Sequence, residues 1–134
     1  GTGWHDELGE GRARGTTINV PLPPGTGGDV YRQGVEALVP IVEDFEPGWV
    51  LVSAGYDGHN LDPLVDLRLV EADYGIFGRT ARELAPAGRL VIFLEGGYNL
   101  GALKRSAAAT LEGAAGQPPA GEPVVSPRSS WQFL

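Results

Sequence analysis

The segment WVLVSAGYDGHNLDP, residues 49–63, joins an apolar run to an abruptly polar loop. The apolar part shows no alternation of polar and apolar residues, which is typical of a strand buried on both faces of a parallel sheet. Asp57 follows this strand directly and is flanked by Gly55 and Gly58. A carboxylate placed there can approach a metal or a substrate, although capping a helix or bonding within the loop is the commoner role of such a residue.

Two more strands are expected on either side of this segment. Residues 16–22 carry β-branched residues and stop at two prolines, and residues 89–97 form another apolar run. Tyr98 follows that run after Gly96 and Gly97, which allow the backbone to pass close to a ligand. The Tyr98 hydroxyl could donate a hydrogen bond to an oxyanion there. The alternative is an aromatic ring that closes the edge of the sheet.

Apolar residues at helical spacing predict three helices between and after the strands. We expect Asp29 to cap the first helix, and Pro40 to kink or shorten it. The predicted apolar faces are Val30, Leu38, Val42 and Phe45; Val70, Tyr74, Phe77, Ala81 and Leu84; and, within residues 99–114, Leu100, Leu103, Ala107, Leu111 and Ala114.

The alternation of strands and helices indicates an α/β fold, a three-layer parallel sheet with helices on both faces. Ligands of such folds bind at the carboxyl ends of the strands. Asp57 and Tyr98 both come just after a predicted strand, so the two residues are expected at this edge of the sheet.

Composition restricts the classes of partner. The chain has 17 acidic and 10 basic residues and a formal net charge of −7, which disfavours nucleic-acid or membrane partners. There is no cysteine, no apolar run long enough to span a bilayer and no visible signal peptide, so a soluble, cytoplasmic protein is expected. Because the sequence begins with Gly1 and lacks methionine, we expect it to be a piece of a longer protein.

The tail and two glycine-rich stretches lie outside the predicted strands and helices. Residues 116–134 hold four prolines between 118 and 127 and no periodicity, which predicts a flexible extension whose Trp131, Phe133 and Leu134 could dock on the body or a partner. PPGTGGD, residues 23–29, lacks the lysine and the Ser/Thr of a phosphate loop, and GEGRARG, residues 9–15, precedes a strand rather than following one. A nucleotide-binding module is therefore the weakest hypothesis.

Four segments together resemble the C-terminal part of the metal-dependent histone deacetylase superfamily, which includes bacterial deacetylases, acetylpolyamine amidohydrolases and acetoin-utilisation proteins. They are GTGWHDELGEG, GRARGTTINVPLPPGTGGDVY, LVSAGYDGHNLDPL and RLVIFLEGGYNLGAL, in family order over residues 1–115. The two later segments look most like the class II-like branch. The resemblance implies an arginase/deacetylase-like fold, of which this chain holds the C-terminal βα units.

The resemblance also implies roles for single residues. Asp57 falls on the second aspartate of a family metal site that holds zinc, or in some members ferrous iron. Tyr98 falls on the tyrosine that hydrogen-bonds the oxyanion. Gly96 and Gly97 fall on the glycines lining the substrate channel, and Leu64 on a position of the pocket wall. His59 and Asp62 belong to the motif without being metal ligands, and are expected to order the loop.

The chain also departs from the family pattern. Val65 and Asp66 stand where members usually have glycines, and the family's Asp-x-His metal pair and tandem histidine dyad precede the matching region. His5 and His59 are not adjacent and cannot form that dyad. The expected partners are therefore an acylated amine substrate, of the acetyl-lysine or acetylpolyamine type, and the missing N-terminal half of the domain. This polypeptide alone is expected to be inactive, weakly metal-binding and aggregation-prone. The alternative is a non-catalytic interaction module that keeps the fold.

Overall fold

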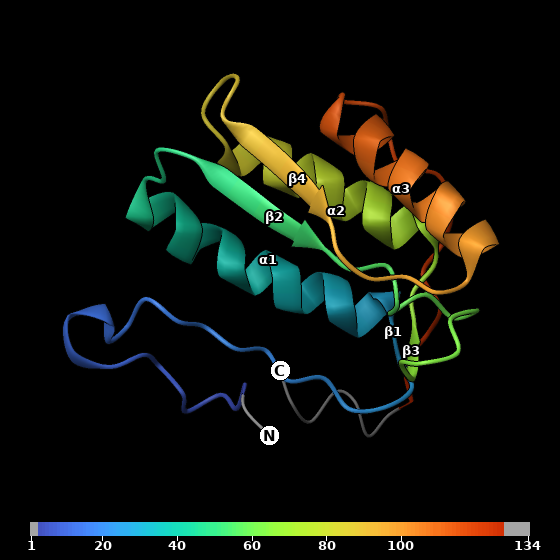
Figure 1. Ribbon diagram of the computed structural model, residues 1–134, viewed down its shortest axis with the longest axis horizontal. Helices are drawn as coiled ribbons and strands as arrows, with labels where there is room; N and C mark the ends of the chain where they lie inside the picture. Colours follow the sequence, from blue (N-terminus) through green and yellow to red (C-terminus); the bar gives the residue numbers. More distant parts are fainter. Residues whose placement is uncertain (1–2, 128–134) are drawn as a thin grey trace.

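The computed structural model describes residues 3–127. At its centre two strands, β2 (Val50–Ala54) and β4 (Leu90–Leu94), pair in parallel, with Val50 opposite Leu90 and Ala54 opposite Leu94. Figure 1 shows them side by side, with helix α2 behind them. Both strands predicted around these residues are confirmed, one or more residues shorter at each end than the apolar runs.

Three helices follow the strands in the alternating order that the sequence predicts: α1 (Gly28–Phe45), α2 (Glu71–Leu84) and α3 (Leu100–Ala114). Tyr31 of α1, Phe77 of α2 and Leu103 of α3 all pack against the buried cluster that contains Val52 and Ala54 of β2. The three helices therefore cover the same face of the β2–β4 pair, and the hydrophobic core lies between that face and the helices.

The opposite face of the strand pair is open. Leu51 of β2 and Phe93 of β4 point to it and are 65% and 50% exposed. Val52 and Ala54 of β2, which point to the helices, are buried. Burial of these strands on both faces, which their apolar sequences predict, is not observed within residues 3–127. A strand that reads as apolar throughout thus has a water-facing side in the described part of the chain.

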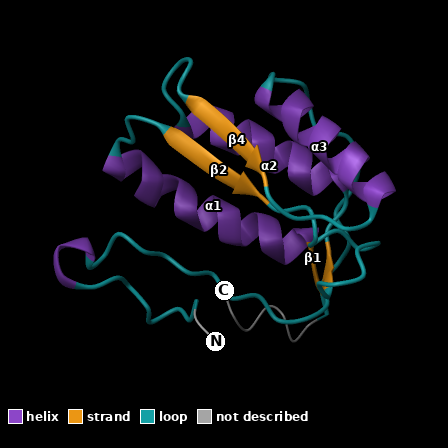
Figure 2. Cartoon of the chain, in the orientation of Figure 1, coloured by secondary structure: helices purple, strands orange, loops and turns teal. Residues whose placement is uncertain are grey.

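Residues 16–22 do not form the predicted strand. They run extended past α1, away from β2 and β4, and no strand lies beside them in the part of the chain that the structure describes (Figures 1 and 2). β-Branched residues favour extended backbone, but a strand also needs a hydrogen-bonded neighbour. Three smaller elements were not predicted: a 3₁₀ turn at Gly11–Ala13, and the short parallel pair β1 (Thr26–Gly27) and β3 (Leu67–Arg68).

The first helix differs from prediction at its start and reaches Phe45, the last residue of its predicted apolar face. Its N-cap is Gly27, and Asp29 lies in the first turn instead of capping it. Pro40 lies inside the helix, which continues to Phe45 and is not shortened. The helix then ends at Glu46, whose φ of 51° lies in the left-handed region.

The third helix buries only part of the predicted face, because Leu103 and Ala107 pack against the core and other members of that face do not. Leu100 and Leu111 are exposed, and the buried residues are small ones on a neighbouring stripe: Ala102, Ser106, Thr110 and Gly113. The cause lies in α2, because a Cβ atom on Gly78 would overlap the carbonyl oxygen of Thr110. The two helix backbones approach so closely that only small side chains fit between them.

The tail packs on the body as far as the structure describes it. Ser126 is buried, its backbone NH donates to the Asp29 carboxylate at 2.9 and 3.0 Å, and its hydroxyl donates to Asp29 as well. The Gly27 NH in turn donates to the Ser126 hydroxyl at 2.8 Å. Ser126 therefore attaches the tail to the start of α1, and the flexibility expected of residues 116–134 stays a prediction. Trp131, Phe133 and Leu134 lie outside the described residues.

Candidate active site

Two loops leave the carboxyl ends of β2 and β4 and stay paired. The Glu95 NH donates to the Ala54 carbonyl, and the Tyr56 NH donates to the Gly96 carbonyl, each at 3.0 Å. These bonds continue the parallel ladder beyond the strands. The loop that carries Asp57 and the loop that carries Tyr98 are therefore brought together, at the edge of the sheet where the strand order predicts them.

The Asp57 carboxylate lies against the second loop. A Cβ atom on Gly96 would stand 3.3 Å from the Asp57 Cγ, and one on Gly55 would stand 3.0 Å from its Oδ1. The two glycines thus leave room for the carboxylate. Its charge also reaches the buried Tyr74: burial of Tyr74, the neighbouring Tyr31 and the Asp57 charge together raise the pKa of the Tyr74 phenol.

Tyr98 and Leu64 lie on the protein surface at this edge of the sheet. Tyr98 is 58% exposed, and Leu64 is also exposed. Gly97, just before Tyr98, has a φ of 126° that side chains rarely adopt, and a Cβ atom there would press on Tyr56 and Leu103. The structure thus gives a physical reason for glycine at position 97.

His59 is a buried member of the loop, with 2% exposure. Its Nδ1 accepts a hydrogen bond from the Leu61 NH at 3.1 Å, and its Nε2 lies 3.4 Å from Oε1 of Glu71. The same Glu71 oxygen accepts from Arg105 Nε at 2.5 Å, and this bond chiefly lowers the pKa of the Glu71 carboxyl. Sequence reasoning missed Glu71 and Arg105, which lie on α2 and α3 and carry no local signal of this contact.

A complete metal site does not form from the described residues alone. Among residues 3–127, no group of three or more His, Cys, Asp or Glu side chains could hold a metal ion. Asp57 offers one carboxylate, whereas a catalytic zinc site needs three protein ligands. The residues present are thus compatible with part of such a site and do not fit a whole one.

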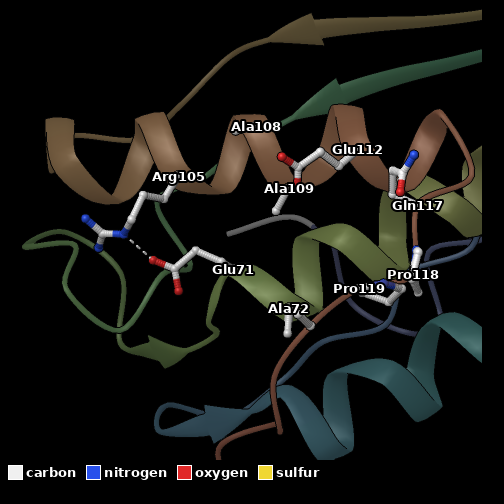
Figure 3. A pocket seen from close by; sticks show the side chains of 11 residues that line it. Glu71, Ala72, Arg105, Ala108, Ala109, Glu112, Gln117, Pro118 and Pro119 are labelled. Carbon is white, nitrogen blue, oxygen red and sulfur yellow. Dashed lines mark hydrogen bonds and ion pairs between the residues drawn. The ribbon is translucent and has the colours of Figure 1, made fainter.

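A separate pocket of about 310 Å³ lies between α2, α3 and the start of the tail (Figure 3). The Glu71–Arg105 ion pair is drawn at one end of it, and alanines and prolines make up much of its lining. None of the predicted site residues lines this pocket. It is therefore distinct from the edge that carries Asp57 and Tyr98.

No helix within residues 3–127 is long and apolar enough to cross a bilayer.

Comparison with known proteins identifies the family. The histone deacetylase domain matches residues 1–114. The chain is 46% identical over 113 residues to "Histone deacetylase 14, chloroplastic" of Arabidopsis thaliana, covering 81% of this chain and 26% of that protein. It is 41% identical over 104 residues to a "Probable deacetylase" of Archaeoglobus fulgidus, covering 75% and 29%.

Solved structures of similar proteins support the same family assignment. The crystal structure of the HDA15 HD domain superposes with a TM-score of 0.85 at 31% identity, over 99% of this chain and 36% of that one. An acetylpolyamine aminohydrolase from Burkholderia pseudomallei gives 0.76 at 26% identity, over 84% and 32%. The predicted α/β fold class is confirmed, and the chain spans about a quarter to a third of these relatives. The chain belongs to the histone deacetylase domain family.

Proposed function

We propose that this chain supplies the C-terminal part of a metal-dependent deacetylase site, which hydrolyses an acyl-amine amide to acetate and a free amine. The observation that carries the proposal is the pairing of the two loops after β2 and β4. Hydrogen bonds at 3.0 Å hold these loops together, and they carry Asp57 and Tyr98 at one edge of the sheet. Membership of the deacetylase and amidohydrolase family supports the same chemistry.

In this proposal each predicted residue has one task. Asp57 contributes one ligand to a zinc ion, or a ferrous ion, and its other ligands come from outside residues 3–127. Tyr98 donates a hydrogen bond to the oxyanion that forms at the amide carbon. Gly96 and Gly97 line the channel of the acylated amine, and Leu64 forms part of its wall. The exposure of Tyr98 and Leu64 supports a surface that substrate or further protein could cover.

The general base and acid are proposed to be the tandem histidines of the same domain's N-terminal half, since His5 and His59 are not adjacent. Relatives that are three to four times longer than the matched segment support this division. The substrate is proposed to be an acetylated lysine or an acetylated polyamine, because relatives named for both chemistries match this chain.

The test uses the natural gene product that contains these residues. Acetate release is measured with an acetyl-lysine peptide and with an acetylated polyamine, beside the zinc content of the purified protein. We expect Tyr98→Phe to lower kcat roughly 10²- to 10³-fold with zinc content unchanged. Asp57→Asn should lower both activity and zinc content, because a neutral amide oxygen replaces the charged carboxylate ligand. Asp66→Asn, the same change at an exposed carboxylate nine residues away, should alter neither.

The isolated 134-residue chain is the second arm of this test, and it should release no acetate. Turnover by that chain would contradict the proposal that the base and the other ligands lie elsewhere. A gene product without acetate release on either substrate would favour the non-catalytic interaction module.

A further inference from the structure

The Asp62 carboxylate joins the two loops of the candidate site. Its Oδ2 accepts hydrogen bonds from the backbone NH of Tyr98 at 2.7 Å and of Asn99 at 3.2 Å. Its Oδ1 accepts from the NH of Leu64 at 3.0 Å. One side chain thus ties its own loop to a backbone 36 residues further along the chain. Hydrogen bonds to an ionised carboxylate are shorter and stronger than neutral ones.

The loop that carries Asp62 is itself held in place. The buried His59 accepts from the Leu61 NH at 3.1 Å, and the Asp62 NH donates to the His59 carbonyl at 2.8 Å. The Asn99 side chain also binds this loop, since its Nδ2 donates a hydrogen bond to the Leu61 carbonyl at 3.1 Å. The same Asn99 caps α3 through a bond from the Ala102 NH to its Oδ1. Asp62 therefore connects a fixed loop to the start of a helix.

Tyr98 needs such a restraint. The residue before it, Gly97, can adopt many backbone conformations, and the Tyr98 side chain is largely in water. The direction of the phenol then depends on how its backbone is held. Desolvation acts to raise the pKa of Asp62, but hydrogen bonds from the backbone NH groups of Tyr98, Leu64 and Asn99 together outweigh it, so the pKa lies below its usual value. The carboxylate is thus ionised at neutral pH.

We propose that Asp62 is a positioning residue that fixes the Tyr98 backbone and so aims the phenol at the reacting carbonyl. This inference rests on the proposed function, in which Tyr98 stabilises the oxyanion. Asp62 touches no reacting atom; it acts through Tyr98. Displacement of a catalytic group by about 1 Å can cost as much as 10²-fold in rate, so the effect of losing Asp62 is measurable.

The test is a double-mutant cycle in the natural gene product. Asp62→Asn, which keeps the shape but removes one acceptor oxygen and the charge, should lower kcat roughly 10- to 100-fold with little change in KM or zinc content. In the Tyr98→Phe background the same change should cost less than about threefold, because the group that Asp62 positions is already gone. Asp66→Asn is the matched control and should be silent in both backgrounds.

A second readout does not depend on activity. Hydrogen exchange of a peptide covering residues 95–100 should speed up in Asp62→Asn and stay unchanged in Asp66→Asn. If Asp62→Asn does not fold, Asp62→Glu, which keeps the charge and shifts the carboxylate, takes its place in both measurements. Equal losses of kcat in the two backgrounds, or unchanged exchange, would overturn the positioning role. Unchanged activity in Tyr98→Phe would instead overturn the proposed function.

Discussion

The Asp29 side chain makes a different contact from the one that its position in the sequence predicts. It stands at the start of α1, where a capping role is the natural expectation, yet its carboxylate accepts bonds from both the NH and the hydroxyl of Ser126. Burial acts to raise the pKa of Asp29, but the bonds from Ser126 and Val30 outweigh it, so the pKa is lowered. The hydrogen bonds between Asp29 and Ser126 thus attach the tail to α1, and their strength depends on the charge of the Asp29 carboxylate.

This contact predicts that the tail loosens in acid. Because the folded pKa is lowered, the stabilisation is fully present above the unfolded value of about 3.9 and is lost as the pH falls through the folded value. Hydrogen exchange of residues 117–127, corrected for its intrinsic pH dependence, should therefore show protection at pH 6 that falls away below about pH 4. Asp29→Asn should already lack this protection at pH 6, and Asp44→Asn, an exposed carboxylate near the end of α1, should behave as the parent. Protection that persists in Asp29→Asn would contradict the role of the carboxylate.

At the level of single residues, the sequence predicts which two loops lie together better than it predicts the contacts between them. The rule that ligands gather at the carboxyl ends of parallel strands was enough to put Asp57 and Tyr98 on neighbouring loops. The bond between Asp62 and the Tyr98 NH, and the approach of His59 to Glu71, join residues 36 and 12 positions apart. Such partners depend on the path of the loops in space, for which periodicity and motif spacing carry no information.

At the level of elements, α2 and α3 pack through glycines. A Cβ atom on Gly78 would overlap the Thr110 carbonyl, and one on Gly113 would overlap the carbonyl of Gly75. Periodicity predicted α2 correctly but selected Leu100 and Leu111 for the buried face of α3, where Thr110 and Gly113 are buried instead. Hydrophobicity finds large apolar residues, and it misses an interface whose closeness requires small ones.

The close approach predicts opposite outcomes for two glycine substitutions. Ala normally stabilises a helix by up to about 1 kcal/mol relative to Gly. At Gly78 the added methyl would meet backbone that cannot rotate away, so Gly78→Ala should lower the free energy of unfolding by about 2 kcal/mol or more. At the exposed Gly101 of α3 the new atom would meet side-chain ends at 3.4 Å, and Gly101→Ala should be neutral or slightly stabilising. Urea unfolding of both variants measures the difference; equal effects would contradict close packing as the cause.

At the level of the whole molecule, the open face of the β2–β4 pair is an exposed apolar surface of the described chain. Trp49, two residues before Leu51 and so on the same side, is also exposed, and with Leu51 and Phe93 it forms an apolar surface. The apolar composition of β2 and β4 predicts a sheet covered on both sides, whereas one side of the pair is open within residues 3–127.

The last prediction concerns this surface directly. Exposed apolar patches and unpaired strand edges promote association, so the isolated 134-residue chain should self-associate in a concentration-dependent way. Replacing Leu51 and Phe93 together by Thr, which keeps the preference for strand, should shift the association midpoint to roughly tenfold higher concentration, since about 1.4 kcal/mol of apolar contact would be lost. Leu111→Gln, at an equally exposed apolar residue on α3, should leave the midpoint nearly unchanged. Sedimentation velocity over a dilution series compares the three proteins. An equal shift for Leu111→Gln would mean that general surface hydrophobicity, rather than the open sheet face, drives the association.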